Sequence, residues 1–301
     1  MNIRIATRGS RLALCQSEIV KKKIMSLDPS ARCKLLIVRT AGDRNQHAPL
    51  HALGGKGVFV REIEECLLNG EADLAVHSMK DMPAELPQGL CFADAWEGED
   101  PRDALVLRQG IDEQTLHARP CVIATGSLRR AAQLKRLYPK VTCVDIRGNV
   151  ETRLARMEER QLDGLVLAAA GLIRLGLRSR IARCFDEEEM VPAPAQGMLA
   201  LECRTQDEDL LALLRRGSDA RARSRAYMER GFLQAMHADC HQPVGACLRH
   251  QGSRLIFDCM WGNAGAASFA KAQVSGTCGM EEELLNEAVD IIERQVRAWA
   301  E

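Results

Sequence analysis

The sequence lacks a long apolar segment. Nowhere do 18 consecutive apolar residues occur, and no apolar run follows the first charges of MNIRIATRGS at residues 1–10. A membrane-spanning helix needs about 20 apolar residues, so neither a membrane span nor a signal peptide is expected. This absence predicts a cytoplasmic protein without a membrane partner.

Cysteine pairs at CxxC spacing are also missing, although the chain contains 12 cysteines. Disulfide scaffolds are typical of short secreted chains, whereas these cysteines are scattered through 301 residues of ordinary composition. We expect most of them to be reduced and buried, where they pack as small hydrophobic side chains.

The chain has no net charge, because 41 basic residues balance 41 acidic ones, and this gives no reason to expect a nucleic-acid partner. The charges are nevertheless uneven. Arginines number 32 and lysines 9, and the stretch from Arg119 to Arg183 holds 14 basic residues against 5 acidic ones. High genomic GC content produces the same arginine bias, but guanidinium groups also bind carboxylates through two parallel hydrogen bonds. The positive stretch is consistent with a site for a polyanion.

The first two-thirds of the chain alternates short apolar runs with amphipathic segments. Strands are predicted at residues 3–6, 34–38, 73–76, 105–107, 122–124, 141–145, 164–168 and 198–202. Helices are predicted at residues 10–26, 58–68, 127–137, 150–160 and 207–215. Apolar strands that alternate with helices are typical of α/β domains with mostly parallel sheets.

The pattern changes after residue 219. A predicted helix at 220–235 precedes alternating stretches near 255–260 and 268–274, and a long helix runs from about 280 to 299. This indicates a smaller α+β domain at the C-terminus. The Pro-containing segment 191–197 is typical of a linker and would return the chain to the first domain. The predicted domains are 1–100 with 195–218, 101–194, and 219–301.

Two strand-to-helix junctions have similar sequences, IATRGS at 5–10 and IATGS at 123–127. Ser10 and Ser127 can each cap the helix that follows, and the free N–H groups of a helix N-terminus suit an anion. Such caps are common without any ligand, but Arg8 adjoins the first junction, and Arg129 and Arg130 adjoin the second. The two junctions suggest two similar α/β domains, each with an anion site.

Polar groups also gather in AVHSMKDMP at residues 75–83, directly after a predicted strand. The carboxyl ends of sheet strands are where α/β folds place ligands. Asp81 could act as a general acid and base or stabilise a cation, and Lys80 could keep it ionised or bind substrate. A solvated turn without a function is the alternative for this segment alone.

A further strand-to-helix crossing, RGNVETR at 147–153, contributes Arg147 and Arg153. GGKG at 54–57 looks like a phosphate loop, but the remaining Walker spacing and its Ser or Thr are absent. We interpret this segment as a loop and not as a nucleotide site.

The C-terminal region contains HADCHQPVGAC at 237–247 and a histidine at position 250. His237, Cys240, Cys247 and His250 could bind zinc, although their spacing is not a standard knuckle. Alternatively, Cys240 is an exposed thiol activated by neighbouring histidines for covalent chemistry. An ordinary loop is the third interpretation, and the residues alone leave all three open.

Together these segments resemble the hydroxymethylbilane synthase family, also called porphobilinogen deaminases. The matching stretches follow the family's order: IATRGS at 5–10, GGKGVF at 54–59, HSMKD at 77–81, EDPRDA at 99–104, SLRR at 127–130, RGNV at 147–150, AGL at 170–172, QG at 196–197 and CxxPxG at 240–245. Each stretch alone is weakly specific, whereas the ordered set is highly specific.

The resemblance implies two α/β domains like the halves of a periplasmic binding protein around a cleft, plus the smaller α+β domain. It implies a dipyrromethane cofactor joined to Cys240 by a thioether and no metal. Four porphobilinogen molecules would then be added in turn, each losing ammonia, to give the linear hydroxymethylbilane of heme biosynthesis. By family precedent the protein would be a monomer.

Residue roles also follow from the resemblance. Asp81 corresponds to the family's catalytic aspartate, which would accept hydrogen bonds from pyrrole N–H groups and stabilise the azafulvenium cation left when ammonia departs. The other residues implied to bind the cofactor are Lys80, Thr125, Ser127, Arg129 and Arg130. Those implied to bind the substrate carboxylates are Arg8, Ser10, Arg147, Arg153 and Arg174.

The chain departs from the family pattern at three positions. Ala238 and Asp239 replace the two glycines that usually precede the cofactor cysteine, and Gly126 replaces a common serine. An acidic side chain beside a carboxylate-rich cofactor is unexpected. A non-catalytic module that binds a carboxylate ligand is the main rival function, and it predicts no covalent adduct on Cys240.

Overall fold

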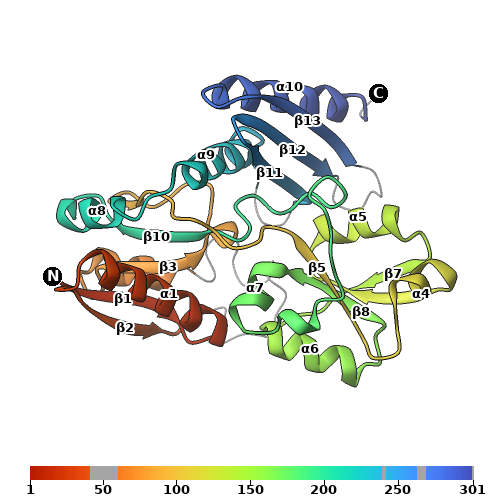
Figure 1. Ribbon diagram of the computed structural model, residues 1–301, viewed down its shortest axis with the longest axis horizontal. Helices are drawn as coiled ribbons and strands as arrows, with labels where there is room; N and C mark the ends of the chain where they lie inside the picture. The colour runs from red at the N-terminus through yellow and green to blue at the C-terminus, as the bar shows by residue number, and fades with distance from the viewer. Residues whose placement is uncertain (41–59, 239–241, 263–268, 300–301) are drawn as a thin grey trace. The chain divides into compact units, whose positions relative to one another are not determined.

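The structure is a computed structural model that describes residues 1–40, 60–238, 242–262 and 269–299. The chain divides into two compact units, whose helices and strands are labelled in Figure 1. Unit 1 comprises Met1–Glu99 and Met198–Arg223, and unit 2 comprises Asp100–Gly197 and Ser224–Glu301. Unit 1 contains one sheet and unit 2 contains two. The division into three domains, with the boundaries given above, stays a prediction.

The sheet of unit 1 has five strands in the order β2-β1-β3-β10-β4. Its strands are β1 (Asn2–Arg8), β2 (Arg32–Val38), β3 (Leu74–Ser78), β4 (Leu90–Phe92) and β10 (Leu199–Arg204). Its helices are α1 (Arg11–Leu27), α3 (Arg61–Leu68), α8 (Glu208–Arg215) and the short 3-10 turn η2 (Met79–Asp81). Strands β1, β2 and β3 run parallel, whereas β10 is antiparallel to both β3 and β4.

Helices cover both faces of this sheet. Val20 and Ile24 of α1 pack with α8 against one face, because α1 turns its apolar stripe towards the strands. Ile63 and Leu67 of α3 pack against the other face. Because successive strand residues point to opposite faces, neighbouring residues of β3 contact different helices.

The first sheet of unit 2 repeats this arrangement in the order β7-β6-β8-β5-β9. Its strands are β5 (Asp103–Leu107), β6 (Cys121–Ala124), β7 (Val141–Val144), β8 (Gly164–Ala168) and β9 (Arg183–Cys184). Its helices are α4 (Glu113–Ala118), α5 (Leu128–Leu137), α6 (Val150–Glu159), α7 (Ala169–Arg174) and the 3-10 turn η3 (Arg178–Arg180). Strands β6, β7 and β8 are parallel, and β5 is antiparallel to β8 and β9.

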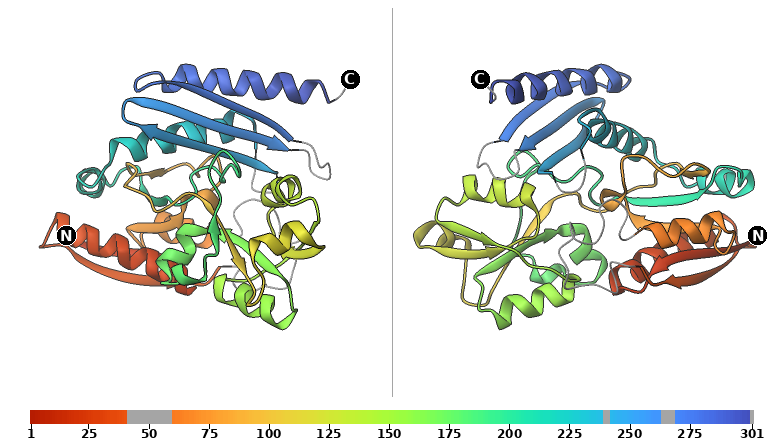
Figure 2. Two further views of the ribbon diagram at one scale, coloured as in Figure 1. Left: turned by 45° about the vertical axis from the view of Figure 1, so that its right-hand side comes forward. Right: turned by 180° about the vertical axis from the view of Figure 1, so that it is seen from behind.

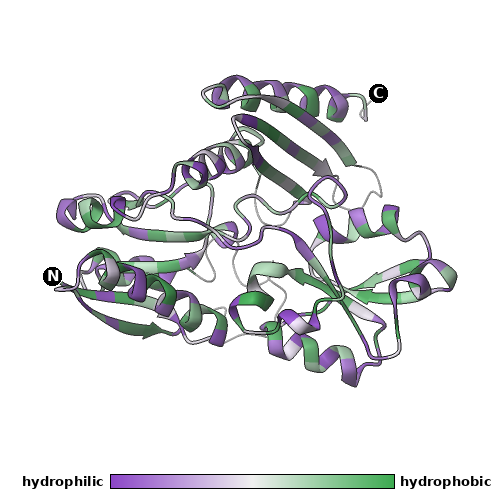
Figure 3. Ribbon diagram, viewed as in Figure 1, coloured by the Kyte–Doolittle hydropathy of each residue, from purple (hydrophilic) through white to green (hydrophobic). Residues whose placement is uncertain are grey.

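The second sheet of unit 2 is a three-stranded antiparallel meander of β11 (Val244–Gln251), β12 (Arg254–Gly262) and β13 (Phe269–Thr277). Helix α10 (Glu281–Arg297) lies along this sheet, as Figure 2 shows from two sides. Residues from α9 (Ala220–Ala235) and α10 join the strands in one apolar core. Figure 3 shows the alternation of hydrophobic and hydrophilic residues along α10 that such one-sided packing requires.

The predicted α/β fold class and the smaller α+β unit are confirmed, but the expectation of mostly parallel sheets is wrong. In each α/β sheet, two of the four strand pairs are antiparallel. The apolar pattern did not reveal this because a strand buried on both faces has the same composition in either direction. The pattern also missed α4 and α7, whose 6 residues each are too few to establish a helical period.

The described cysteines are all free thiols, as expected, but most are not fully buried. Only Cys121, Cys203, Cys247 and Cys259 are buried.

The described part of the chain has no helix that is both long and apolar enough to cross a membrane.

Candidate functional site

In unit 1 the predicted site residues lie at one edge of the sheet. Strands β1 and β3 are parallel neighbours, with Ile5 opposite Leu74, so their carboxyl ends lie at the same edge. Arg8 ends β1, and the turn containing Asp81 follows β3 directly. Two segments about 70 residues apart in the sequence are thereby brought to the same place.

The local geometry of both segments follows from their sequences. Ser10 is the N-cap of α1, and its hydroxyl accepts a hydrogen bond from the N–H of Ala13 at 3.3 Å. After β3 the chain makes the turn η2, in which Lys80 is half-buried and Asp81 is exposed. The exposed carboxylate of Asp81 is accessible to a ligand at this edge.

Two buried side chains hold the residues that precede this turn. Gln16 of α1 donates from Nε2 to the hydroxyl of Ser78 at 2.9 Å on one face of the sheet. On the other face, His77 Nε2 lies 3.1 Å from Oε2 of Glu202 in β10. The last two residues of β3 are therefore anchored from both sides.

In unit 2 the predicted site residues also lie at one edge of a sheet, the sheet that contains β6, β7 and β8. Strands β6, β7 and β8 are parallel, so the segments that follow them meet at one edge. Thr125 and Ser127 follow β6, and Arg147 and Arg153 follow β7. Arg174 lies on α7, which follows β8.

The N-terminus of α5 has the predicted serine cap. The Ser127 hydroxyl accepts from the N–H of Arg130 at 3.4 Å, which makes Ser127 the N-cap. Thr125 is buried, and its hydroxyl accepts from the N–H of Ser127 at 3.2 Å. The first N–H groups of a helix lack partners within the helix and attract negative charge.

Arg129 and Arg130 lie in the interior of unit 2, around Asp103. The sequence alone indicates no role for this aspartate. Both guanidinium groups bind Asp103 of β5, Arg129 from Nη1 at 2.6 Å and Arg130 from Nε at 2.8 Å. Asp103 is completely buried, and Gln196 also donates to it. Burial alone would raise the pKa of Asp103, but the two guanidinium groups outweigh it and hold this pKa well below its usual range.

These contacts change how the two arginines are interpreted. Arg129 also donates from Nη1 to the carbonyl of Val191 at 2.6 Å, and its side chain is only 3% exposed. The resemblance implies that both arginines bind cofactor carboxylates, whereas several of their N–H groups donate to Asp103 and to backbone carbonyls of unit 2. The motif EDPRDA contained Asp103, but only the fold shows that it lies between the two guanidinium groups.

Backbone carbonyls orient two of the other arginines at this edge. Arg153 donates from Nε to the carbonyl of Gly148 at 2.7 Å, and Arg174 donates from Nη2 to the carbonyl of Gly197 at 2.6 Å. Arg147 donates from Nε to Asp145 at 3.1 Å. All three side chains are half-buried.

The predicted cofactor cysteine, Cys240, lies outside the described residues, as do the GGKG segment and Asp239.

Two of the four residues of the zinc alternative, Cys247 and His250, lie together on one described strand. Cys247 and His250 are three residues apart on β11, so their side chains point to opposite faces of the sheet and cannot share one ion. Among residues 1–40, 60–238, 242–262 and 269–299 there is no cluster of His, Cys, Asp and Glu suited to a metal.

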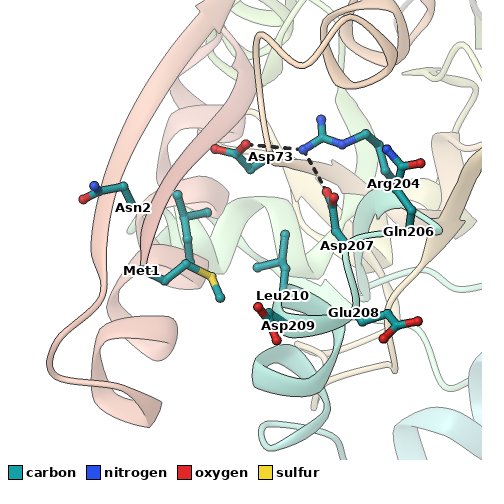
Figure 4. Close-up of a pocket in the computed structure, with 10 residues that line it drawn as sticks. Met1, Asn2, Asp73, Arg204, Gln206, Asp207, Glu208, Asp209 and Leu210 are labelled. Atoms are coloured by element: carbon teal, nitrogen blue, oxygen red, sulfur yellow. Dashed lines mark hydrogen bonds and ion pairs between the residues drawn. The ribbon is translucent and has the colours of Figure 1, made fainter.

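A pocket of about 460 Å³ in unit 1 is not the predicted site (Figure 4). Met1, Asn2 and Asp73 line it, so it lies at the amino ends of β1 and β3, the edge opposite to Arg8 and Asp81. Arg204 reaches both Asp73 and Asp207 there, at 3.4 and 2.8 Å, and neutralises part of the acidic charge.

The sequence that contains these residues matches a known family. The model of the porphobilinogen deaminase dipyrromethane cofactor binding domain matches residues 3–212. The chain belongs to the porphobilinogen deaminase family. The match includes both sheet edges described above and ends before the three-stranded sheet.

Relatives match the chain over nearly its whole length. A porphobilinogen deaminase of Lachnospira eligens is 46% identical over 280 residues, which are 92% of this chain and 95% of the relative. One from Xanthomonas campestris pv. campestris is 42% identical over 293 residues, 96% of this chain and 94% of the relative.

Solved structures show a weaker likeness. The periplasmic VFT2 domain of Bordetella pertussis BvgS matches 76% of this chain and 92% of its own, with 16% identity and a TM-score of 0.43. A periplasmic binding protein from Salmonella typhimurium with high arginine specificity matches 78% of this chain and 98% of its own, with 13% identity and a TM-score of 0.41.

Proposed function

We propose that this chain catalyses the reaction of a hydroxymethylbilane synthase. Four porphobilinogen molecules are condensed in sequence, each with loss of ammonia, and linear hydroxymethylbilane is released. The observation that carries the proposal is the family match across residues 3–212, supported by relatives that are more than 40% identical over more than 90% of the chain. We infer a cytoplasmic monomer with a small-molecule substrate and no membrane or nucleic-acid partner.

Asp81 is the proposed catalytic residue. It is exposed at the carboxyl end of β3, while His77 and Ser78 anchor the strand just before it. When ammonia leaves an aminomethyl pyrrole, positive charge develops on the pyrrole. A carboxylate held beside that charge stabilises it and can accept or return a proton. Lys80, its neighbour in the turn, is placed to bind a carboxylate.

The described residues fit a dipyrromethane cofactor, whose acetate and propionate groups need donors. Thr125, Ser127 and the N-terminus of α5 supply hydroxyl and N–H donors at the unit 2 edge. Arg129 and Arg130 support this helix from inside and contribute positive charge. A dipyrromethane attached to Cys240 supplies the pyrrole carbon to which the first substrate molecule is joined.

The substrate and the lengthening product carry many carboxylates, and the remaining arginines suit them. Arg147, Arg153 and Arg174 lie at the unit 2 edge with their guanidinium groups oriented by neighbouring acceptors. Arg8 and the N-cap Ser10 offer the equivalent donors in unit 1. Guanidinium groups fixed in advance lose little side-chain entropy when a carboxylate binds.

Intact-protein mass spectrometry tests the proposal most directly. We expect an added mass of two pyrrole units on the purified chain, lost in Cys240→Ser and retained in the control Cys278→Ser, since Cys278 is exposed. Incubation with porphobilinogen should add further single pyrrole units and release ammonia. An unmodified chain that binds porphobilinogen without releasing ammonia would instead support the carboxylate-binding module.

A further inference from the structure

A buried acid in unit 2, Glu229 of α9, joins three separate segments of the chain. The residue is completely buried. The N–H of Ala195, in segment 191–197, donates to its Oε2 at 2.7 Å, and the N–H of Leu248 in β11 donates to its Oε1 at 2.9 Å. Arg225, one turn earlier on α9, donates from Nε to Oε1 at 3.0 Å. Nothing in the proposed reaction so far accounts for this acid.

The three donors match an ionised carboxylate, which only accepts hydrogen bonds. Buried N–H groups that lose their acceptor are unfavourable. Without the carboxylate of Glu229, the backbone N–H groups of Ala195 and Leu248 and the guanidinium of Arg225 would each lose a partner. The carboxylate therefore holds α9, β11 and segment 191–197 together.

The backbone of segment 191–197 is strained where it meets α9. Ala195 has a φ of +59°, in the left-handed region that residues other than glycine rarely adopt. Such a conformation persists only where the surrounding contacts impose it. Here they come from α9, because Glu229 accepts from the N–H of Ala195 and Arg225 donates from Nη2 to the carbonyl of Gln196 at 3.3 Å. The helix thus sets the path of the chain into Gln196.

The side chain of Gln196 extends this connection to the buried ion pairs of Asp103. Gln196 is completely buried, its Nε2 donates to Oδ1 of Asp103 at 3.0 Å, and its Oε1 accepts from Nη2 of Arg130 at 3.3 Å. Arg130 lies in the first turn of α5, whose N-cap is Ser127. Glu229 is therefore joined by hydrogen bonds to the start of α5.

A second connection runs beside the first. The N–H of Ala246 in β11 donates to the carbonyl of Pro192 at 3.0 Å. The preceding carbonyl, that of Val191, accepts from Nη1 of Arg129 at 2.6 Å. Segment 191–197 thus connects β11 and α9 with the start of α5 at both of its ends.

In the sequence, the residues that contain Cys240 join α9 to β11. We propose that Glu229 is a positioning residue, which holds these two elements in a defined place relative to the cofactor-binding N-terminus of α5. The inference rests on the proposed function, since this placement matters only if Cys240 carries the dipyrromethane. A displacement of about 1 Å can slow a reaction about 10²-fold. Loosening the connection should therefore slow the attachment of the cofactor.

Amide hydrogen exchange, measured by NMR on the full chain, tests the connection without any reference to activity. In Glu229→Gln the amides of Ala195 and Leu248 should exchange about tenfold faster than in the wild type, because they lose a charged acceptor. Glu287→Gln is the matched control, since Glu287 is exposed on α10 of the same unit, and it should leave both rates unchanged. Wild-type exchange rates in Glu229→Gln would overturn the proposal.

Attachment of the cofactor tests the positioning role. The full chain is produced without cofactor, incubated with porphobilinogen well below its unfolding temperature, and followed by intact-protein mass spectrometry. Glu229→Gln should gain its two pyrrole units about tenfold more slowly than the wild type, whereas Glu287→Gln should match the wild type. A normal attachment rate combined with faster amide exchange would reduce Glu229 to a purely structural role and contradict the inference.

Gln196→Met interrupts the connection at a different point and decides the question if Glu229→Gln does not fold. Methionine has a similar length but cannot donate to Asp103. Attachment should again slow, while the amide of Leu248 keeps its wild-type exchange rate because Glu229 keeps its donors. Normal attachment in this variant would also contradict the inference. A wild type that gains no pyrrole units would contradict the proposed function instead, and the amide exchange would still decide whether Glu229 joins the three segments.

Discussion

The carboxyl-end edges of the two α/β sheets have similar architecture but carry different sets of charged side chains. In unit 1 the turn after β3 exposes Asp81, with Lys80 beside it, and Arg8 ends the neighbouring strand β1. In unit 2 the corresponding edge carries guanidinium groups whose partners are backbone carbonyls and acidic side chains. Parallel strands only determine where a site can form. The residues in the segments that follow the strands determine which charges the edge presents.

The two edges also differ in how they are held. Behind the unit 1 turn are the buried contact between His77 and Glu202 and the Gln16–Ser78 hydrogen bond. Behind the α5 N-terminus of unit 2 is a carboxylate between two guanidinium groups, Asp103 with Arg129 and Arg130. The second arrangement keeps its charge at acidic pH, because the two guanidinium groups hold the pKa of Asp103 well below its usual range.

Asp81→Asn tests the catalytic side of the comparison and has the largest expected effect. The amide has nearly the same shape but cannot stabilise a developing cation or exchange a proton, so turnover should fall by about 10² or more. Because Asp81 is exposed, the unfolding transition should stay within about 0.5 kcal/mol of the wild type. Ammonia release and urea unfolding measure the two quantities. Near-normal turnover would show that unit 1 is not the catalytic side.

Asp103→Asn tests whether the unit 2 edge depends on its buried charges. Removing the carboxylate leaves two guanidinium groups buried without their counter-charge, and we expect a loss of about 3–5 kcal/mol in unfolding free energy. Glu158→Gln is the control, because its pair with Arg180 is exposed on both sides and should contribute about 1 kcal/mol or less.

The same carboxylate predicts a pH dependence. The pKa of Asp103 is lowered in the folded state, so its stabilisation is complete above the ordinary aspartate pKa of about 4 and is lost as the pH falls further. Urea unfolding between pH 7 and pH 2 should therefore show a steeper decline for the wild type than for Asp103→Asn. Parallel declines would indicate that the pair is not a buried ion pair in solution.

The two helix caps provide the smallest and most symmetric test. Ser10→Ala and Ser127→Ala should each cost about 1 kcal/mol of unfolding free energy, because each hydroxyl accepts one N–H at a helix start. Ser26→Ala is a matched control on α1, where the hydroxyl is exposed and caps no N-terminus. Equal losses would confirm that the two junctions are structurally equivalent. A loss in only one would show that the sequence similarity between them does not extend to the caps.

Much of the site could be predicted from local sequence. The N-cap roles of Ser10 and Ser127 follow from a serine placed directly before an amphipathic run, and strand β8 has the predicted bounds. The positions of Arg8 and Asp81 at the ends of predicted strands also follow from the local pattern. These features depend on neighbours within a few residues, which is why a pattern reveals them.

Other features were beyond local sequence. Asp103 is 26 residues before Arg129 in the sequence. Its burial cannot be seen in the residues around it, because it depends on contacts between β5 and the start of α5. Likewise, Glu202 meets His77 from 125 residues away only because β10 runs antiparallel beside β3. The zinc alternative for Cys247 and His250 was ruled out only when β11 proved to be a continuous strand.

The sequence by itself determined the family, the alternation of strands and helices, and the residues that follow each strand. Only the tertiary structure decided which charges are neutralised inside the units and which remain exposed at the edges. The physical reason is that a guanidinium or carboxylate has the same local sequence signal in either case. Its charge state and availability depend on burial and on partners that the fold brings from distant parts of the chain.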